Sequence, residues 1–265
     1  MSILLVANQG SLFRKVYSSL LFFYSVEVFV VGSFDDASAL ACAFFDLVRL
    51  KKFDCIVYIS GETRDTSRMH CLNIFLPSLI ARQCHSLDIP FLGLSSLSVF
   101  GNPRTYHIHE FSARIPSCSY GVTKNNFDLF LMNSLNGLYA SILIPGSIIN
   151  PSSSHNIFSK CRKWFHTWPF IPIFLQAVSP SGFFPCIHID DLVCAIVEET
   201  RVLLSRQKNT DKGAVKFVIC SFNVPLSIIF SSISFRKSRF LLPAISPSLI
   251  SRILFFLPPL IRMKL

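Results

Sequence analysis

Tyr120 and Lys124 are the two residues whose types and spacing most directly indicate chemistry in this sequence. If the segment is helical, positions four apart lie on one face, one turn from each other. An ammonium group beside a phenol favours the phenolate and lowers the phenol pKa from its ordinary value of about 10. Such a tyrosine donates and accepts a proton near neutral pH. The same spacing also arises by chance on a surface helix, so the surrounding sequence must decide.

Two hydroxyl groups precede this pair. The apolar run 89–94 predicts a buried strand, and Ser95 and Ser96 follow it directly. A serine at the end of a neighbouring strand could hydrogen-bond the same substrate oxygen as the tyrosine. One of these two serines could therefore complete a catalytic group with Tyr120 and Lys124.

The stretch 91–124 resembles the extended short-chain dehydrogenase/reductase family. More narrowly, it is similar to the NAD-dependent epimerase/dehydratase branch, which acts on nucleotide sugars. In that family a strand ends in SS-x-x-VYG and a helix carries SYG-x-[ST]K, and this chain has SSLSVFG and SYGVTK. The resemblance implies that Ser96 binds the substrate, Tyr120 is the acid or base, and Lys124 holds the nicotinamide ribose. It also places Ser95 and Glu110 beside the substrate.

Further motifs are similar to the same family. Residues 54–61, DCIVYISG, resemble D-x-V-[VI]-H-L-A-G, in which a small pair lets the backbone approach the cofactor. Ser60 and Gly61 keep that smallness, although an ordinary strand with a glycine turn would look the same. Asn73 falls where the family has an Asn that braces the active-site strands, although the Gly-Thr that follows it there is absent. Residues 187–192, IHIDDL, resemble IHVDDLA, which ties the substrate lobe to the main sheet.

The first turn between strand and helix lacks the glycines that the family places against the cofactor pyrophosphate. Asn8, Ser11 and Arg14 stand at the three glycine positions, and Gly10 lies one place early. Asn can adopt the left-handed conformation of glycine, Ser can donate to a phosphate, and a helix N-terminus favours an anion. Arg14 would either clash where helix meets sheet or swing out towards a phosphate. We expect cofactor binding to be retained, with its loss as the alternative. The residues expected to bind the cofactor are Asn8, Gly10, Ser11, Ser60, Gly61 and Lys124.

The sequence leaves open whether that cofactor is NAD or NADP. An acidic residue at the end of the second strand would hold a ribose hydroxyl. Gly32 and Ser33 occupy that region instead, and Asp35 and Asp36 come slightly late.

Two other polar clusters have alternative interpretations. The His-Ile-His-Glu run 107–110 lacks a further set of ligands, so no metal is expected. Arg162 and Lys163 lie near two tryptophans, a mixture that nucleic-acid-binding proteins also use. The family resemblance favours a pocket in which Arg162 and Lys163 bind the nucleotide sugar, and no nucleic acid is expected.

Composition and charge narrow the class of protein. The chain has 265 residues, of which 51% are hydrophobic and 15% are charged. Residues 1–150 carry 11 Lys and Arg against 10 Asp and Glu, a net charge of +1, whereas residues 151–265 carry 14 against 5, a net charge of +9. A basic second part suits an anionic nucleotide diphosphate, or an anionic membrane surface that the tail 246–265 could contact, although solvated basic residues need no partner. Nine cysteines without a C-x-x-C pair favour reduced thiols and a cytoplasmic location.

Strand-like apolar runs alternate with helical patterns along the chain. This order is typical of a parallel sheet covered on both faces, and the predicted class is α/β, a doubly wound, Rossmann-like fold with a small C-terminal substrate lobe. Residues 1–150 are predicted to form the dinucleotide-binding core and 151–265 mainly the lobe, with 187–200 and 216–222 returning to the core. Strands are expected at 2–7, 26–31, 53–59, 89–94, 139–144 and 217–222, and helices at 12–23, 37–50, 66–86 and 119–137.

The resemblance implies an NAD(P)-dependent enzyme that epimerises, dehydrates or reduces a nucleotide sugar by hydride transfer at a sugar carbon. It also implies a role in making surface polysaccharide and a homodimer paired through the helices up to and including the Tyr/Lys helix. The alternative is a Rossmann-fold binding or regulatory protein with a weakened cofactor site and no turnover. The Ser, Tyr and Lys residues favour the enzyme, and the missing glycines favour the alternative.

Overall fold

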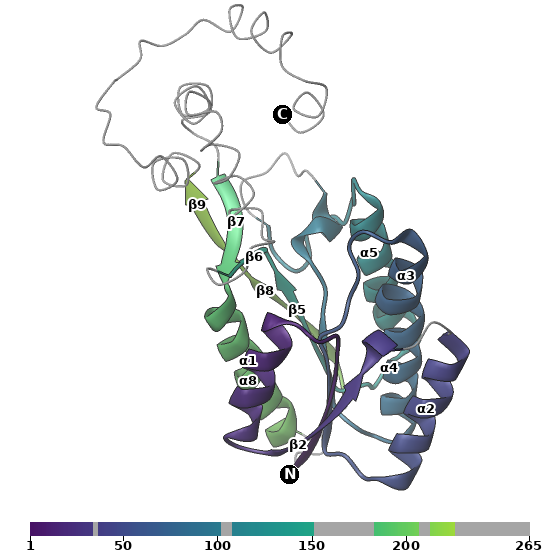
Figure 1. Cartoon of the computed structure of the whole chain (residues 1–265). Helices are drawn as coiled ribbons and strands as arrows, with labels where there is room; N and C mark the ends of the chain where they lie inside the picture. Colours follow the sequence, from purple (N-terminus) through teal and green to yellow (C-terminus); the bar gives the residue numbers. More distant parts are fainter. Residues whose placement is uncertain (34–36, 102–107, 151–182, 207–212, 226–265) are drawn as a thin grey trace, which may run out of the picture. The chain divides into compact units, whose positions relative to one another are not determined.

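The computed structural model describes residues 1–33, 37–101, 108–150, 183–206 and 213–225 (Figure 1). Its main sheet has six strands in the order β2-β1-β3-β4-β5-β8, and all neighbours are parallel. The chain passes from β1 to β2 on one side and then to β3 on the other, so the winding reverses between β1 and β3. The predicted doubly wound α/β fold is confirmed. The strands are β1 (Ser2–Ala7), β2 (Ser25–Val30), β3 (Cys55–Tyr58), β4 (Phe91–Leu94), β5 (Ala140–Pro145) and β8 (Val215–Cys220).

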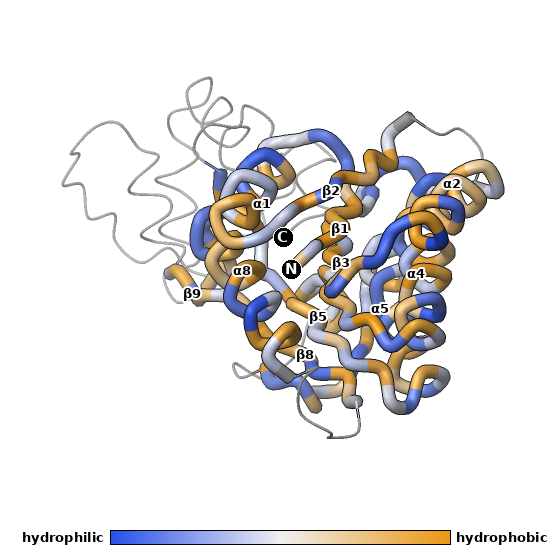
Figure 2. The backbone as a smooth tube through the Cα atoms, turned by 90° about the horizontal axis from the view of Figure 1, so that it is seen from below, coloured by the Kyte–Doolittle hydropathy of each residue, from blue (hydrophilic) through white to orange (hydrophobic). Residues whose placement is uncertain are grey.

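Helices cover both faces of this sheet. Helices α1 and α8 lie on one face and α2, α4 and α5 on the other, as Figures 1 and 2 both show. Strands β1, β3, β4 and β5 are buried along almost their entire length, which is why they read as continuous apolar runs. The helices are α1 (Ser11–Leu21), α2 (Ala37–Leu50), α3 (Thr66–His70), α4 (Leu76–Ser86), α5 (Ser119–Ser134) and α8 (Ile189–Arg206), with short turns η1 (Val31–Ser33), η2 (Cys71–Phe75) and η3 (Leu97–Phe100).

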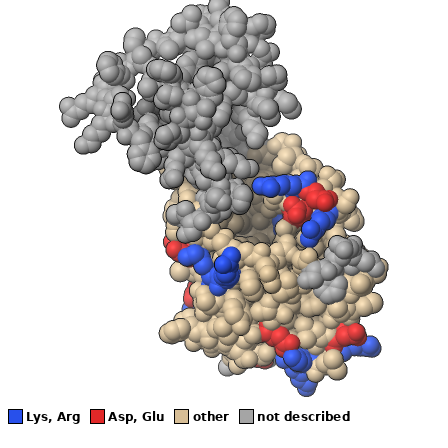
Figure 3. All heavy atoms as spheres, viewed as in Figure 1, with Lys and Arg blue, Asp and Glu red and all other residues tan. Residues whose placement is uncertain are grey.

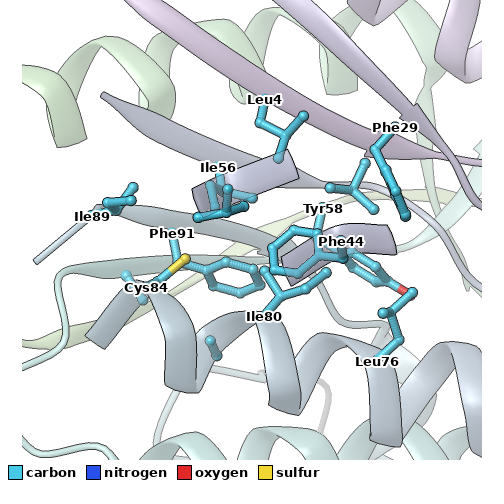
Figure 4. Packing of buried hydrophobic residues seen from close by; sticks show 14 of the residues in the cluster. Leu4, Phe29, Phe44, Ile56, Tyr58, Leu76, Ile80, Cys84, Ile89 and Phe91 are labelled. Atoms are coloured by element: carbon cyan, nitrogen blue, oxygen red, sulfur yellow. The ribbon is translucent and has the colours of Figure 1, made fainter. Parts of the chain in front are cut away.

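Aliphatic and aromatic side chains together fill the core between the sheet and the helices α2, α4 and α5 (Figure 4). Phe29 of β2 meets Phe44 of α2 edge to face, with ring centroids 5.9 Å apart. Phe91 of β4 packs in the same way against Phe127 of α5, at 6.2 Å. Edge-to-face pairs add to the free energy gained from burying the rings. The second pair fixes the Tyr/Lys helix against the strand that ends in the serine pair.

The segment predicted as a helix over 66–86 is helical but interrupted by a π turn, η2. Pro77 has no N–H to donate to the carbonyl group four residues back, so a regular α-helix cannot continue through it. The N–H of Leu76 donates instead to the oxygen of Cys71, five residues back, which is the π pattern. Asn73 lies within this turn and is fully buried.

Gly121 lets α5 begin against η3. A Cβ atom at this position would lie 2.5 Å from the backbone oxygen of Ser98, so only glycine fits. The thiol of Cys118 accepts a hydrogen bond from the Gly121 N–H at 3.4 Å and caps the helix. The glycine of the Ser-Tyr-Gly sequence is therefore required for packing, and this packing brings Tyr120 to the ends of the strands.

Replacing Gly121 with alanine should force α5 away from η3. We expect a loss of about 1–3 kcal/mol in the free energy of unfolding, as for other overpacked positions. Urea unfolding measures it, and Gly10→Ala is the matched control because a Cβ atom there meets no atom within 4 Å. Equal stability of the two variants would contradict the packing argument.

The chain divides into two units, Met1–Ile148 with Ile187–Ser221 and Ile149–Cys186 with Phe222–Leu265. A second sheet has the order β6-β7-β9, formed by β6 (Ser147–Ile149), β7 (Phe183–His188) and β9 (Phe222–Pro225), with β7 and β9 antiparallel. Most of the predicted substrate lobe, with Arg162, Lys163 and the tail 246–265, lies outside the described residues. No helix in the described part of the chain is both long and apolar enough to cross a membrane.

Candidate active site

The predicted cofactor residues gather where the winding of the sheet reverses. Asn8 follows β1, Gly10 and Ser11 begin α1, and Ser60 and Gly61 follow β3, the neighbour of β1. In open α/β sheets, ligands bind at the carboxyl ends of the strands at this reversal. The N-terminus of α1 has no side-chain cap, and the space beside Gly10 is open. These residues fit the phosphates of a dinucleotide, because uncapped N–H groups at a helix N-terminus attract anions.

Asn8 links the ends of two neighbouring strands. Among the described residues other than glycine, only Asp88 has a positive φ, so Asn8 does not use the left-handed conformation that is open to an asparagine. Its Nδ2 instead donates to the oxygen of Gly61 at 3.5 Å and links the ends of β1 and β3. Its Oδ1 is buried and has no hydrogen-bond partner among the described residues. An amide thus stands where the family has bare backbone.

Arg14 does not disturb the packing of helix against sheet. Its side chain is exposed, and α1 packs on the sheet through Val16 and Leu20. Of the two alternatives for Arg14, a clash or a side chain that swings out, the clash is therefore wrong. The sequence pattern placed Arg14 at a glycine position, but the described helix keeps it on the solvent face.

Tyr120 and Ser96 come together as predicted, at the start of α5 and the end of β4. A side-chain hydrogen bond from Ser96 favours the Tyr120 phenolate, but burial is the larger effect and raises the Tyr120 pKa to about 12. The predicted lowering of this pKa by Lys124 is wrong, because burial dominates. At neutral pH the phenol is therefore protonated.

Lys124 is buried, with only 3% of its surface exposed. Its Nζ donates to the backbone oxygen of Leu94 at 2.9 Å, and a Cβ atom on Gly61 would lie 3.4 Å from it. The ammonium group therefore lies between the carboxyl ends of β3 and β4. Burial lowers the Lys124 pKa to about 8, and the negative charge of Asp128 opposes that change.

This burial makes the stability of the fold depend on pH. The Lys124 pKa is about 8 in the folded protein against an ordinary 10.5, so between these values the unfolded chain binds more protons. Stability therefore rises with pH in this window. From pH 8 to 10 we expect the free energy of unfolding to rise by about 2 kcal/mol relative to Lys124→Met, measured by urea unfolding. Because the Tyr120 pKa is about 12 in the folded protein, Tyr120 makes stability fall as the pH rises, but only above about pH 10. Parallel pH profiles of the two proteins would refute the buried ammonium.

Asn73 braces the site as the resemblance implied. Its Nδ2 donates to the oxygen of Glu62 at 2.8 Å and to Oγ1 of Thr123 at 3.0 Å, and its Oδ1 accepts from the Glu62 N–H at 3.1 Å. It thus joins the loop after β3 to α5, one residue before Lys124. The π turn directs this amide inward, so the bracing is kept although the Gly-Thr of the family is absent.

Ser95, predicted to contact substrate, points into the core instead. It is buried, and its hydroxyl donates to Oδ2 of Asp128 at 2.7 Å. Arg114 binds the same carboxylate through Nη1. Sequence reasoning missed Arg114 and Asp128, although Asp128 continues the stripe of Tyr120 and Lys124 by one more turn of helix.

The remaining predicted residues add little to this site. Glu110 is exposed on the loop before α5. In the motif 187–192, Asp190 pairs with Lys15 of α1 at 2.6 Å and so ties α8 to α1. The free cysteines among the described residues include Cys42, Cys55, Cys84, Cys118, Cys194 and Cys220, and no group of three possible metal ligands occurs in this part of the chain.

A surface hollow of about 570 Å³ lies among α2, α4 and α5, away from this site. Phe45, Phe75 and Phe130 line it, and the Arg82 guanidinium lies 5.0 Å from the centroid of the Phe130 ring. None of its lining residues belongs to the strand ends. Charged side chains are few on the visible face of the described residues (Figure 3).

The fold and the site together define a Rossmann-like protein with a Ser-Tyr-Lys group at the strand ends. A scan against protein-family models and a search of curated proteins both find no match. Among solved structures, the chain is similar to a dTDP-4-dehydrorhamnose reductase from Clostridium acetobutylicum, with a TM-score of 0.66 and 17% identity over 93% of this chain and 88% of that one. It is also similar to the Bordetella bronchiseptica enzyme WbmG in complex with NAD and UDP, with a TM-score of 0.64 and 17% identity over 92% and 82%. A UDP-glucose 4-epimerase from Thermotoga maritima with UDP-glucose gives a TM-score of 0.64 and 14% identity over 88% and 81%.

Two of these structures are by name a nucleotide-sugar reductase and a nucleotide-sugar epimerase, the third is an enzyme in complex with NAD and UDP, and the chain shares the fold of all three. The resemblance stated from the motifs is therefore confirmed at the level of the fold.

Proposed function

We propose that this protein is an NAD(P)-dependent enzyme that reduces or epimerises a nucleotide sugar. The observation that carries the proposal is the meeting of Ser96, Tyr120 and Lys124 at the strand ends, beside the reversal point where α1 begins. The three side chains come from two elements far apart in sequence. Their types match a site that moves a proton to or from a sugar oxygen.

The nicotinamide, when bound, supplies or accepts the hydride at the sugar carbon. Asn8, Ser11 and the N-terminus of α1 would hold the phosphates, and Lys124 would hold the nicotinamide ribose. Ser96 would orient the sugar oxygen towards the Tyr120 hydroxyl. Because the Tyr120 phenol is protonated at neutral pH, it is best suited to give its proton to a carbonyl oxygen, which is the direction of reduction. In the reverse direction it would take the proton of the hydroxyl group.

Binding and turnover test this proposal separately. Thermal shifts with NAD, NADH, NADP and NADPH should show stabilisation by at least one of them at millimolar concentration. Turnover is then followed as the loss of reduced-nicotinamide absorbance with a dTDP-4-keto sugar, and as epimerisation of UDP-glucose. The absence of a shift with every nucleotide would end the proposal.

The alternative is a binding or regulatory protein without turnover. The Asn8 amide favours it, because its hydrogen bond to Gly61 spans the ends of β1 and β3 where a pyrophosphate would approach. If the amide obstructs the site, Asn8→Gly should bind nucleotide at least tenfold more tightly, measured by calorimetry. If Asn8 assists binding, the same change should weaken it. The matched control is Asn136→Gly, on the exposed loop after α5.

Several finer expectations stay predictions. These are the role in surface polysaccharide synthesis, the cytoplasmic location, the homodimer, and contact of the tail 246–265 with a membrane.

A further inference from the structure

Asp128 is a fully buried carboxylate one helical turn beyond Lys124. Its Oδ2 accepts from the Ser95 hydroxyl at 2.7 Å and from Nη1 of Arg114. The Arg114 guanidinium lies 4.5 Å from the centroid of the Phe217 ring and 5.5 Å from that of Phe100, and only 9% of its side chain is exposed. Three ionisable groups, Arg114, Asp128 and Lys124, thus share the core directly behind the strand ends.

In this cluster the Asp128 carboxylate interacts with two cations, Arg114 and Lys124. Burial disfavours the charged form of each group. The negative charge of Asp128 opposes the lowering of the Lys124 pKa by burial. The positive charge of Arg114 is the largest of the effects that oppose the raising of the Asp128 pKa by burial. Oδ1 of Asp128 and Nη2 of Arg114 are buried without a hydrogen-bond partner among the described residues. The charge of Asp128 therefore acts on Lys124 through space and not through a hydrogen bond.

The protonation state of Lys124 decides how many donors it offers. An ammonium group has three N–H bonds, and one of them is used by the oxygen of Leu94. Two remain for a ligand at the strand ends, whereas a neutral amine keeps one. Any group that holds the charge on Lys124 therefore also sets its capacity to bind hydroxyl groups.

We propose that Asp128 is a positioning residue that keeps Lys124 charged at the strand ends, and that Arg114 opposes it by sharing the same carboxylate. The inference rests on the proposed function only where Lys124 is assigned the nicotinamide ribose. Among the described residues, Asp128 on α5 is the charged group that acts on Lys124, and the neutral groups beside its Nζ are Gly61 after β3 and the backbone oxygen of Leu94 in β4. Arg114 stands behind Asp128 and belongs to the loop before α5.

Removing the negative charge of Asp128 and removing the positive charge of Arg114 should shift the midpoint of Lys124 titration in opposite directions. In Asp128→Asn the carboxylate is lost and Arg114 remains, so the midpoint of Lys124 titration should fall by about one pH unit or more. In Arg114→Gln the carboxylate is released to Lys124, so the midpoint should rise. Both are measured by NMR of lysine ε-carbons and ζ-nitrogens in labelled protein, with the Lys124 signal assigned by its absence in Lys124→Arg.

Two further variants serve as controls for this test. Asp128→Glu keeps the charge and should restore a midpoint close to that of the native protein, so the comparison with Asp128→Asn decides the matter even if Arg114→Gln fails to fold. Glu199→Gln is the matched control, because Glu199 also accepts from a serine, Ser141 at 2.7 Å, and from a cation, Lys216 at 2.9 Å. It should leave the Lys124 midpoint unchanged.

The result that overturns the inference is a Lys124 midpoint that stays fixed, or moves in the same direction, in Asp128→Asn and Arg114→Gln. This titration needs no nucleotide. A native protein that binds no NAD or NADP would therefore end the proposed function, while the titration alone decides the inference about Asp128.

Discussion

Replacing Tyr120 with phenylalanine should lower turnover by about 10²–10⁴-fold, because the change removes the proton donor and nothing else. The ring keeps its place at the start of α5, and only the hydroxyl beside Ser96 is lost. Nucleotide binding should stay the same, since Lys124 and the N-terminus of α1 are untouched. The measurement is the rate constant for turnover of the sugar substrate, together with the thermal shift by the nucleotide.

Tyr139→Phe is the matched control for this change. Tyr139 precedes β5, so it lies at the amino ends of the strands, at the opposite edge of the sheet from the site. Its hydroxyl has no part in the proposed chemistry, and turnover should be the same as in the native protein. If Tyr120→Phe keeps full activity, or loses nucleotide binding together with turnover, Tyr120 is not the acid of the reaction.

The strands of this fold could be predicted from sequence because burial on both faces leaves a simple pattern. Residues 2–7 and 89–94 contain only apolar and small residues or nearly so, and both form strands of the central sheet within two residues of the prediction. A parallel sheet covered by helices requires such runs. The strand predicted at 217–222 is found at Val215–Cys220, since polar Lys216 can occupy the edge strand β8 and pair with Glu199 of α8.

The meeting of Ser96 and Tyr120 could also be predicted, because spacing and motif place both residues at strand ends. The sign of the Tyr120 pKa change could not. Spacing tells which charged neighbour is near, but the pKa depends on the balance between that neighbour and burial, which is a property of the packed site. Lys124 is itself buried, so its ammonium group is weakened as a source of positive charge.

Charge pairs between a loop and a helix are also difficult to predict from sequence. Arg114 lies on a loop and Asp128 inside a helix, and neither belongs to a motif. Only the packing of α5 against the end of β4 brings them together with Ser95. The signal that could have found Asp128 is its position one turn beyond Lys124, because a carboxylate on the buried face of a helix needs a partner.

Replacing Arg114 with alanine should lower the free energy of unfolding by about 3–5 kcal/mol, one of the largest effects available in this chain. The change leaves the Asp128 carboxylate fully buried without its closest cation and removes the guanidinium from between the Phe100 and Phe217 rings. Since Arg114 acts to lower the Asp128 pKa, the pKa should rise further in the variant. A group whose folded pKa lies above its unfolded value binds the extra proton in the folded state, so the variant should lose stability as the pH rises. Urea unfolding at pH 5 and pH 8 measures both effects.

The matched control is Arg201→Ala on α8. Arg201 pairs with Glu198 at 2.6 Å, but the two side chains are 65% and 57% exposed, and a solvated pair contributes only about 0–1 kcal/mol. The double change Arg114→Met with Asp128→Leu removes both buried charges at once. It should recover most of the stability, because replacing a whole buried ion pair with apolar side chains is often neutral, whereas removing one partner is not. If Arg114→Ala costs no more than Arg201→Ala, the pair is solvated in solution, and the three ionisable groups behind the strand ends do not form the water-excluded cluster on which the charge of Lys124 depends.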